Sequence, residues 1–179
     1  MTKRVGIVGS GIMGSGIAEV AAKAGTEVVL RSRSQATADA MVAGLEKSLA
    51  KQAERGKLED GERAAVLGRV SAVSDLGALS DCDLVIESIR EDLPTKKHLF
   101  VKDGAIPATN PSTLPVVEMA METGRPELVC GVHFFNPAPM MPLVELVRAI
   151  TTSDETIATA RAFAEACGKK PVEVKDQAG

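Results

Sequence analysis

A glycine-rich turn close to the N-terminus restricts the fold of this chain more than any other feature of the sequence. The turn contains Gly9, Gly11 and Gly14, follows an apolar run at residues 5–8 and leads into an alanine-rich, helix-forming stretch. A second stretch of strand type, Glu27-Val28-Val29-Leu30, lies at the right distance to be the next strand. In such a unit the first glycine makes the turn, the second lets the backbone approach a pyrophosphate, and the third lets helix and strand pack closely. Because a helix N-terminus favours anions, the sequence predicts a cradle for the phosphates of a dinucleotide. The candidate residues of this cradle are Gly9, Gly11, Ile12, Met13 and Gly14.

Strand and helix patterns alternate along the rest of the chain. Apolar runs predict strands at residues 70–73, 84–86, 106–109, 128–133, 143–147 and 172–174, and helical spacing predicts helices at 35–55, 61–67, 96–101, 116–122 and 154–167. Such alternation is typical of an α/β protein whose parallel sheet is covered on both faces. We therefore expect a Rossmann-type, doubly wound, mostly parallel sheet from which the helices at 35–55 and 61–67 project as a hairpin. Residues 1–179 are expected to form one dinucleotide-binding domain.

The composition argues against several other classes of protein. The chain is 45% hydrophobic, but no apolar run approaches the roughly 18–20 residues of a membrane span. The N-terminus leads directly into the first strand without a secretory signal, which favours a cytoplasmic location. Cys82, Cys130 and Cys167 are too few and too scattered for a disulfide framework or a zinc site. A net charge of −3 gives no general attraction to nucleic acid. We expect no metal, nucleic-acid or membrane partner.

A second informative stretch surrounds His133, one of 2 histidines in the chain. Residues 131–137 read Gly-Val-His-Phe-Phe-Asn-Pro, and Glu145 follows at some distance. Imidazole titrates near neutral pH, and a carboxylate bonded to its far nitrogen would fix the tautomer and favour the imidazolium that forms on taking a proton. These residue types therefore fit a proton-transfer site. A half-buried histidine in a turn explains the stretch equally well when it is considered alone.

In this order and at these separations, the motifs resemble the N-terminal domain of the short-chain 3-hydroxyacyl-CoA dehydrogenase family, over the whole chain. The motifs that carry the resemblance are residues 9–18 (Gly-Ser-Gly-Ile-Met-Gly-Ser-Gly-Ile-Ala), 83–87 (Asp-Leu-Val-Ile-Glu), Asn110 with Ser112, 133–137 (His-Phe-Phe-Asn-Pro) and 143–145 (Leu-Val-Glu). The resemblance implies an oxidoreductase that interconverts 3-hydroxyacyl-CoA and 3-oxoacyl-CoA by hydride transfer with a nicotinamide cofactor. It also implies that His133 is the general acid and base, that Glu145 orients its ring, and that Ser112 hydrogen-bonds the substrate oxygen.

The resemblance implies binding roles for further polar residues. Those expected to line the nicotinamide and its ribose are Glu91, Lys96, Asn110 and Asn136. Without the resemblance, Glu91 and Lys96 would be interpreted as an ion pair on a helix surface and Asn110 as a turn residue. Ser48 and Arg55 are expected to meet the 3′,5′-ADP part of acyl-CoA, where Lys47, Lys51 and Lys57 add positive charge. A solvated basic helix face remains an alternative for that group.

The residues after the second strand predict the choice of cofactor. Most members of the family place an acid there that holds the adenosine ribose hydroxyls, whereas this chain reads Arg31-Ser32-Arg33. An acid would repel a 2′-phosphate, but a serine between two arginines offers it donors and charge. We expect NADP(H) to be favoured over NAD(H), by about ten- to a hundredfold if one charged hydrogen bond is gained. Exposed arginines at a strand end are the alternative interpretation.

Three further departures from the family bear on activity. The segment between Phe100 and Asn110 is shorter than usual, and Pro107 falls inside a predicted strand. Pro111 replaces a threonine and restricts the backbone beside the expected nicotinamide site. The family chain also continues beyond Gly179 into a helical dimerisation domain, which we expect to be absent here, leaving apolar surface for a homo-oligomer or a partner. A nucleotide-binding module without turnover is therefore the alternative to an enzyme.

Overall fold

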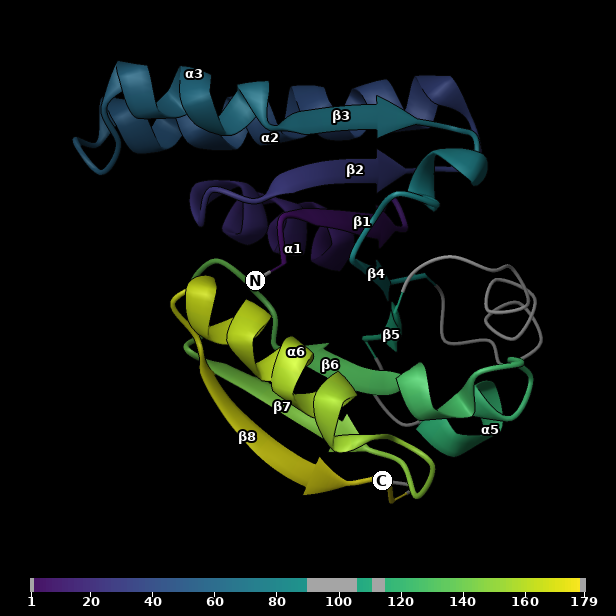
Figure 1. The fold of residues 1–179 in the computed structure, drawn as a ribbon. Helices are drawn as coiled ribbons and strands as arrows, with labels where there is room; N and C mark the ends of the chain where they lie inside the picture. The colour runs from purple at the N-terminus through teal and green to yellow at the C-terminus, as the bar shows by residue number, and fades with distance from the viewer. Residues whose placement is uncertain (1, 90–105, 111–114, 178–179) are drawn as a thin grey trace.

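The computed structural model describes residues 2–89, 106–110 and 115–177. Within them, one sheet has the strand order β3-β2-β1-β4-β5-β6-β7-β8 (Figure 1). The strands from β3 to β6 run parallel, β7 is antiparallel to β6, and β8 is parallel to β7. The strands are β1 (Arg4–Val8), β2 (Glu27–Arg31), β3 (Val70–Val73), β4 (Leu84–Glu87), β5 (Ile106–Thr109), β6 (Cys130–Phe134), β7 (Leu143–Arg148) and β8 (Lys170–Lys175). The order reverses between β1 and β4, so the expected doubly wound, mostly parallel fold is confirmed.

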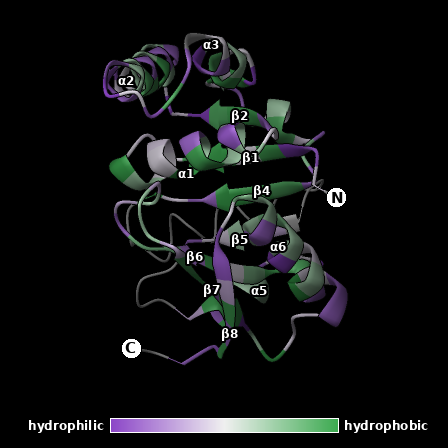
Figure 2. Ribbon diagram, turned by 90° about the vertical axis from the view of Figure 1, so that its left-hand side faces the viewer, coloured by the Kyte–Doolittle hydropathy of each residue, from purple (hydrophilic) through white to green (hydrophobic). Residues whose placement is uncertain are grey.

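Helices cover both faces of this sheet. The helices are α1 (Ile12–Lys23), α2 (Gln35–Glu54), α3 (Asp60–Gly68), α5 (Val116–Ala120) and α6 (Asp154–Ala166), with 3-10 turns at Gly77–Leu79 and Pro126–Leu128. Buried residues of α1, α2, α3 and α6 share one core with inward-facing strand residues such as Ile7 and Phe134. A smaller cluster around Leu79 and another around Met119 of α5 lie in separate cores. In Figure 2, β1, β2 and β4 are mostly hydrophobic in colour, as buried parallel strands should be.

The predicted hairpin is present and consists of α2 and α3. The Ser34 hydroxyl accepts a hydrogen bond from the Thr37 N–H and so caps the start of α2. Gly56, with a φ of 66°, follows the end of α2. A capping box between Glu59 and Glu62 then starts α3. The hairpin is therefore determined by local signals at each end, and it packs on α1 and β3.

Pro107 lies in β5, a central strand where proline is unexpected. The Asn110 N–H donates to the Glu87 carbonyl of β4, so the N–H groups of alternate residues in β5 face β4 and the nitrogen of Pro107 faces β6. Pairing between β5 and β6 begins only at Ala108. The missing donor of Pro107 therefore falls before the ladder with β6 starts, and it disrupts no pair of that ladder.

Candidate functional site

Gly9, Gly11 and Gly14 are glycines for different structural reasons. Gly9 has a φ of 129°, and a Cβ there would overlap with the carbonyl oxygen of Ser88. A Cβ at Gly14 would overlap with the carbonyl oxygen of Gly9, so helix and turn approach as closely as their backbones allow. Gly11 has open space around its Cβ position. The first and third glycines thus shape the turn, and the second leaves room beside it.

The start of α1 fits a bound pyrophosphate. Gly11 is the N-cap of α1, and no side chain caps this end through a hydrogen bond. The first turn of α1 contains no acidic residue that would repel an anion. Free N–H groups at a helix N-terminus bind phosphate well, particularly where a glycine lets the ligand come close. The local geometry therefore accommodates the diphosphate of a dinucleotide.

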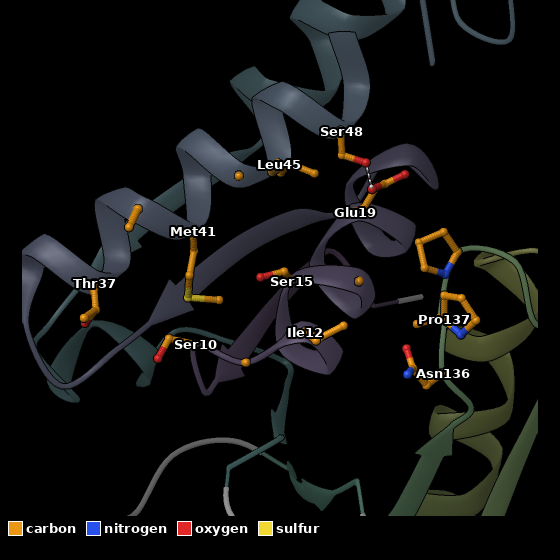
Figure 3. A pocket seen from close by; sticks show the side chains of 16 residues that line it. Ser10, Ile12, Ser15, Glu19, Thr37, Met41, Leu45, Ser48, Asn136 and Pro137 are labelled. Atoms are coloured by element: carbon orange, nitrogen blue, oxygen red, sulfur yellow. Dashed lines mark hydrogen bonds between the residues drawn. The ribbon is translucent and has the colours of Figure 1, made fainter. Parts of the chain in front are cut away.

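A groove of about 520 Å³ begins at this turn and runs between α1, α2 and the loop that follows β6. Figure 3 shows Thr37, Met41 and Leu45 along the side of α2 that faces α1, with Asn136 and Pro137 on the opposite wall. Among the residues predicted from the sequence, the groove brings together Gly11, Ile12, Ser48 and Asn136. The loop of Asn136 is fixed by Lys169, whose ammonium donates to the carbonyls of Ala138 and Met141 at 2.7 and 2.9 Å.

A buried polar cluster at one end of the groove joins α1 to α2. Glu19 is only 4% exposed. Its carboxylate accepts hydrogen bonds from Ser48 at 3.0 Å and from Gln52 and Lys23 at 2.8 Å each. Burial by itself raises the pKa of Glu19, but the bonds from Lys23, Gln52 and Ser48 and the charge of Lys23 outweigh it and lower the pKa. Glu19 was not a predicted site residue; the only signal for it is an acid within the otherwise apolar run of residues 17–22.

His133 and Glu145 face each other across the antiparallel pair β6 and β7. The His133 Nδ1 atom lies 3.0 Å from a carboxylate oxygen of Glu145, and both side chains are partly exposed. The imidazole ring also packs on Phe135, with ring centroids 4.5 Å apart. If Nδ1 carries the proton and donates a hydrogen bond to Glu145, then Nε2 is the nitrogen free to accept a proton. The pair does not line the groove, although Asn136 of the groove follows His133 closely in the chain.

Asn110 is a buried link at the ends of three strands. Its side-chain oxygen accepts a hydrogen bond from the Phe134 N–H of β6 at 2.8 Å. Its own N–H donates to the Glu87 carbonyl of β4 at 2.8 Å. Asn110 therefore fixes the carboxyl ends of β4, β5 and β6 relative to one another, at the edge where doubly wound sheets bind ligands.

The residues predicted to select the cofactor differ in whether their side chains are free to contact a ligand. Ser32 is buried, and its hydroxyl lies 2.6 Å from the hydroxyl of Thr37. Arg31 donates from Nε to the carbonyl of Ser74. Arg33 is exposed. Of the three, Arg33 is the side chain most able to reach a ligand.

Several predicted residues lie elsewhere. Ser112, Glu91 and Lys96, as well as Pro111, fall outside the described residues. Arg55 is exposed at the C-terminal end of α2 and does not line the groove. The expected contacts of these residues with cofactor or substrate therefore remain predictions.

The cysteines show no sign of reactivity. All 3 are free, and burial raises the pKa of the Cys130 and Cys167 thiols to about 12. Within residues 2–89, 106–110 and 115–177, no group of three potential metal ligands comes together. In the same part of the chain, no helix is both long and apolar enough to cross a membrane.

Comparison with known proteins gives consistent matches. The family of the 3-hydroxyacyl-CoA dehydrogenase NAD binding domain matches residues 4–177. The chain is 42% identical to a probable 3-hydroxybutyryl-CoA dehydrogenase of Deinococcus radiodurans and 40% identical to 3-hydroxybutyryl-CoA dehydrogenase of Mycobacterium tuberculosis. These alignments cover 98% and 99% of this chain but 65% of each relative, so the chain spans slightly less than two thirds of their length. The crystal structure of (S)-3-hydroxybutyryl-CoA dehydrogenase PaaH1 from Ralstonia eutropha superposes with a TM-score of 0.93 at 36% identity, over 99% of this chain and 65% of that one.

Proposed function

Since the chain belongs to the family of 3-hydroxyacyl-CoA dehydrogenase NAD-binding domains, we propose that it interconverts 3-hydroxyacyl-CoA and 3-oxoacyl-CoA with a nicotinamide cofactor. The observation that carries this proposal is the contact of 3.0 Å between His133 Nδ1 and Glu145. It supplies an oriented base close to the carboxyl ends of the parallel strands, where ligands of such sheets bind. The glycine turn supports the cofactor half of the proposal, because its geometry fits a diphosphate.

His133 is the proposed catalytic base. In the oxidising direction, Nε2 takes the proton of the substrate hydroxyl; in the reducing direction, the imidazolium returns it to the oxygen. Glu145 holds the ring and stabilises the charge that the ring gains. Hydride transfer at the substrate carbon is the chemistry that a nicotinamide cofactor would supply when bound. Ser112 is proposed to hydrogen-bond the substrate oxygen, and Glu91, Lys96, Asn110 and Asn136 to line the nicotinamide and its ribose.

The proposed cofactor preference is for NADP(H) over NAD(H). It is supported by the exposed Arg33 and by the absence of an acid between Arg31 and Arg33, where an acid would repel a 2′-phosphate. Arg31 has one nitrogen bonded to Ser74 and can still contribute charge. Ser32 acts mainly by being neutral, because its hydroxyl is already paired with Thr37.

The proposed chemistry is tested with the 179-residue chain and acetoacetyl-CoA, by following oxidation of the reduced cofactor through its absorbance. We expect His133→Gln to lower kcat by about 10²- to 10⁴-fold, because proton transfer contributes that much. Glu145→Gln should lower kcat less and leave KM nearly unchanged, since Glu145 acts through the ring. Cofactor affinity, measured by fluorescence titration, should be unchanged in both variants.

Two other outcomes would contradict different parts of the proposal. Turnover by the His133→Gln variant at the wild-type rate would refute the role of His133. Cofactor binding without turnover in the wild-type chain would favour the second candidate function, a nucleotide-binding module.

A further inference from the structure

The polar cluster between α1 and α2 leaves Ser48 a restricted choice of partners. A serine hydroxyl has one proton to donate, and Ser48 donates it to the Glu19 carboxylate at 3.0 Å (Figure 3). The Ser48 oxygen in turn accepts from Gln52 at 3.3 Å. A phosphate at neutral pH mainly accepts hydrogen bonds. Ser48 could bind one only by giving up its charge-assisted bond to Glu19.

The charge distribution leads to the same conclusion. Glu19 is among the residues that line the groove, whereas its partner Lys23 is not. Because Glu19 is paired with Lys23 at 2.8 Å, an anion in the groove would meet an ion pair whose negative member lines the groove, at an almost fully buried position where screening by solvent is weak. Arg55 lies about 10 Å beyond Ser48 along the axis of α2, as seven helical residues span that length, and Lys57 is exposed near it. The exposed Lys47 and Lys51 of α2 lie closer to Ser48, so Arg55 and Lys57 are the cations that are separated from the polar cluster.

We propose that Glu19 is a specificity-determining residue: it reserves this end of the groove for the uncharged, amide-bearing arm of an acyl thioester and directs the phosphates of the thioester to the basic end of α2. The inference rests on the proposed function and refines it. A carboxylate has about four acceptor sites, of which Ser48, Gln52 and Lys23 fill three, so one remains for an amide N–H. Met41, Leu45 and Pro137 supply apolar walls for the carbon chain of the arm. Ser48 keeps a role in substrate binding, as the residue that fixes the orientation of Glu19.

The test compares two ligands that differ in their phosphates. Acetoacetyl-CoA carries the amide arm and the phosphates, and acetoacetyl-pantetheine carries the amide arm alone. Their dissociation constants are measured by calorimetry, without cofactor, for the wild-type chain and for Glu19→Gln, Ser48→Ala and Arg55→Ala. We expect Glu19→Gln to weaken both ligands by the same factor, about three- to tenfold, because it removes one charged acceptor. Ser48→Ala should also affect both ligands equally. Arg55→Ala should weaken acetoacetyl-CoA alone.

Other patterns would overturn the inference. If Glu19 lies beside a phosphate, Glu19→Gln will tighten acetoacetyl-CoA and leave acetoacetyl-pantetheine unchanged. If Ser48 donates to a phosphate, Ser48→Ala will weaken acetoacetyl-CoA alone, and this variant decides the question should Glu19→Gln fail to fold. NADPH affinity serves as the control for intact structure. If neither thioester binds the wild-type chain, the proposed function itself is refuted, and the groove assignment falls with it.

Discussion

At the scale of single residues, the glycines of the turn differ in whether the fold or a bound ligand requires them. Gly9 needs its positive φ, and Gly14 needs the absence of a side chain. Gly11 has a φ of −82°, which any residue adopts, and its Cβ position is open. A side chain at Gly11 therefore costs the fold little and fills space that we assign to the cofactor pyrophosphate.

This difference predicts opposite effects for two substitutions. Gly14→Ala should destabilise the chain by about 1–3 kcal/mol, because the new methyl group overlaps with a backbone carbonyl. Gly11→Asp should leave the free energy of unfolding unchanged or slightly higher, because aspartate is a favoured N-cap. It should nevertheless weaken cofactor binding by about a hundredfold or more through repulsion of the diphosphate.

Urea unfolding and fluorescence titration measure the two effects separately. A Gly11→Asp variant that keeps wild-type cofactor affinity would show that the pyrophosphate does not bind at this turn. A Gly14→Ala variant as stable as the wild type would show that the turn can relax away from the new methyl group.

Single residues of interest could be identified from the sequence only where a motif marks them, and their roles stay proposals. The glycines are recognisable because strand, turn and helix follow in order, and the facing positions of His133 and Glu145 agree with the pairing of β6 and β7. Glu19 could not be identified, since its partners Ser48 and Gln52 come from another helix and meet it only in the folded chain. The bond from Phe134 to Asn110 is likewise invisible before the strands are aligned.

At the scale of elements, Glu19 couples the stability of the α1–α2 contact to pH. The native pKa of Glu19 is lowered from its ordinary value of 4.5, so the unfolded chain binds protons more readily than the native one. The stabilisation by Glu19 is then fully present above the unfolded pKa and is lost as pH falls through the lowered native pKa. We expect Glu19→Gln to cost about 2 kcal/mol at pH 7, as loss of a charged hydrogen bond does. The difference from wild type should shrink below about pH 4.5.

Urea unfolding of both proteins as a function of pH measures this difference. Asp39→Asn on the exposed face of α2 is a matched control, because it removes an acid that does not join α1 to α2. A difference between wild type and Glu19→Gln that stays constant from neutral to acidic pH would show that the Glu19 charge does not stabilise this contact.

Element types were predictable from local pattern, and their ends were less so. The α2–α3 hairpin follows from its caps and apolar spacing. Strand β6 starts at Cys130 rather than at 128 because Pro126–Leu128 forms a 3-10 turn. Strand β8 starts at Lys170 and includes Pro171, which an edge strand tolerates. The Lys170 N–H donates to the carbonyl of Pro142, the residue before β7. The nitrogen of Pro171 therefore faces away from the sheet.

At the scale of the whole molecule, the sheet order brings distant segments to one edge. The ends of β1, β2, β4 and β6 are far apart in sequence, yet parallel strands place their carboxyl ends together. The alternating pattern predicts this class of sheet but does not specify the order of the strands. The connection between β6 and β7 is too short for a parallel crossover, which explains why β7 reverses direction. The contact of His133 with Glu145 depends on that reversal.

Cofactor binding at this edge should raise the stability of the whole domain, so the stability gained with each cofactor measures its affinity. A ligand that binds only the native state stabilises it by RT ln(1 + [L]/Kd), which is about 2.7 kcal/mol at a hundred times Kd. If NADPH binds ten- to a hundredfold more tightly than NADH, equal saturating concentrations should differ by about 1.4–2.7 kcal/mol. In thermal unfolding, this difference corresponds to a Tm that is several degrees higher with NADPH.

Arg33→Ala identifies the source of the difference. Because Arg33 is exposed, its removal should change the stability of the ligand-free chain by less than about 0.5 kcal/mol. It should reduce the Tm shift with NADPH to the size of the shift with NADH, whose ribose has no 2′-phosphate for a guanidinium to bind. Equal shifts with the two cofactors in the wild-type chain would contradict the proposed preference. If the Arg33→Ala variant still prefers NADPH, Arg31 would be the residue that binds the 2′-phosphate. Arg31 uses Nε to bond Ser74, and its other guanidinium nitrogens remain as donors at the same end of β2.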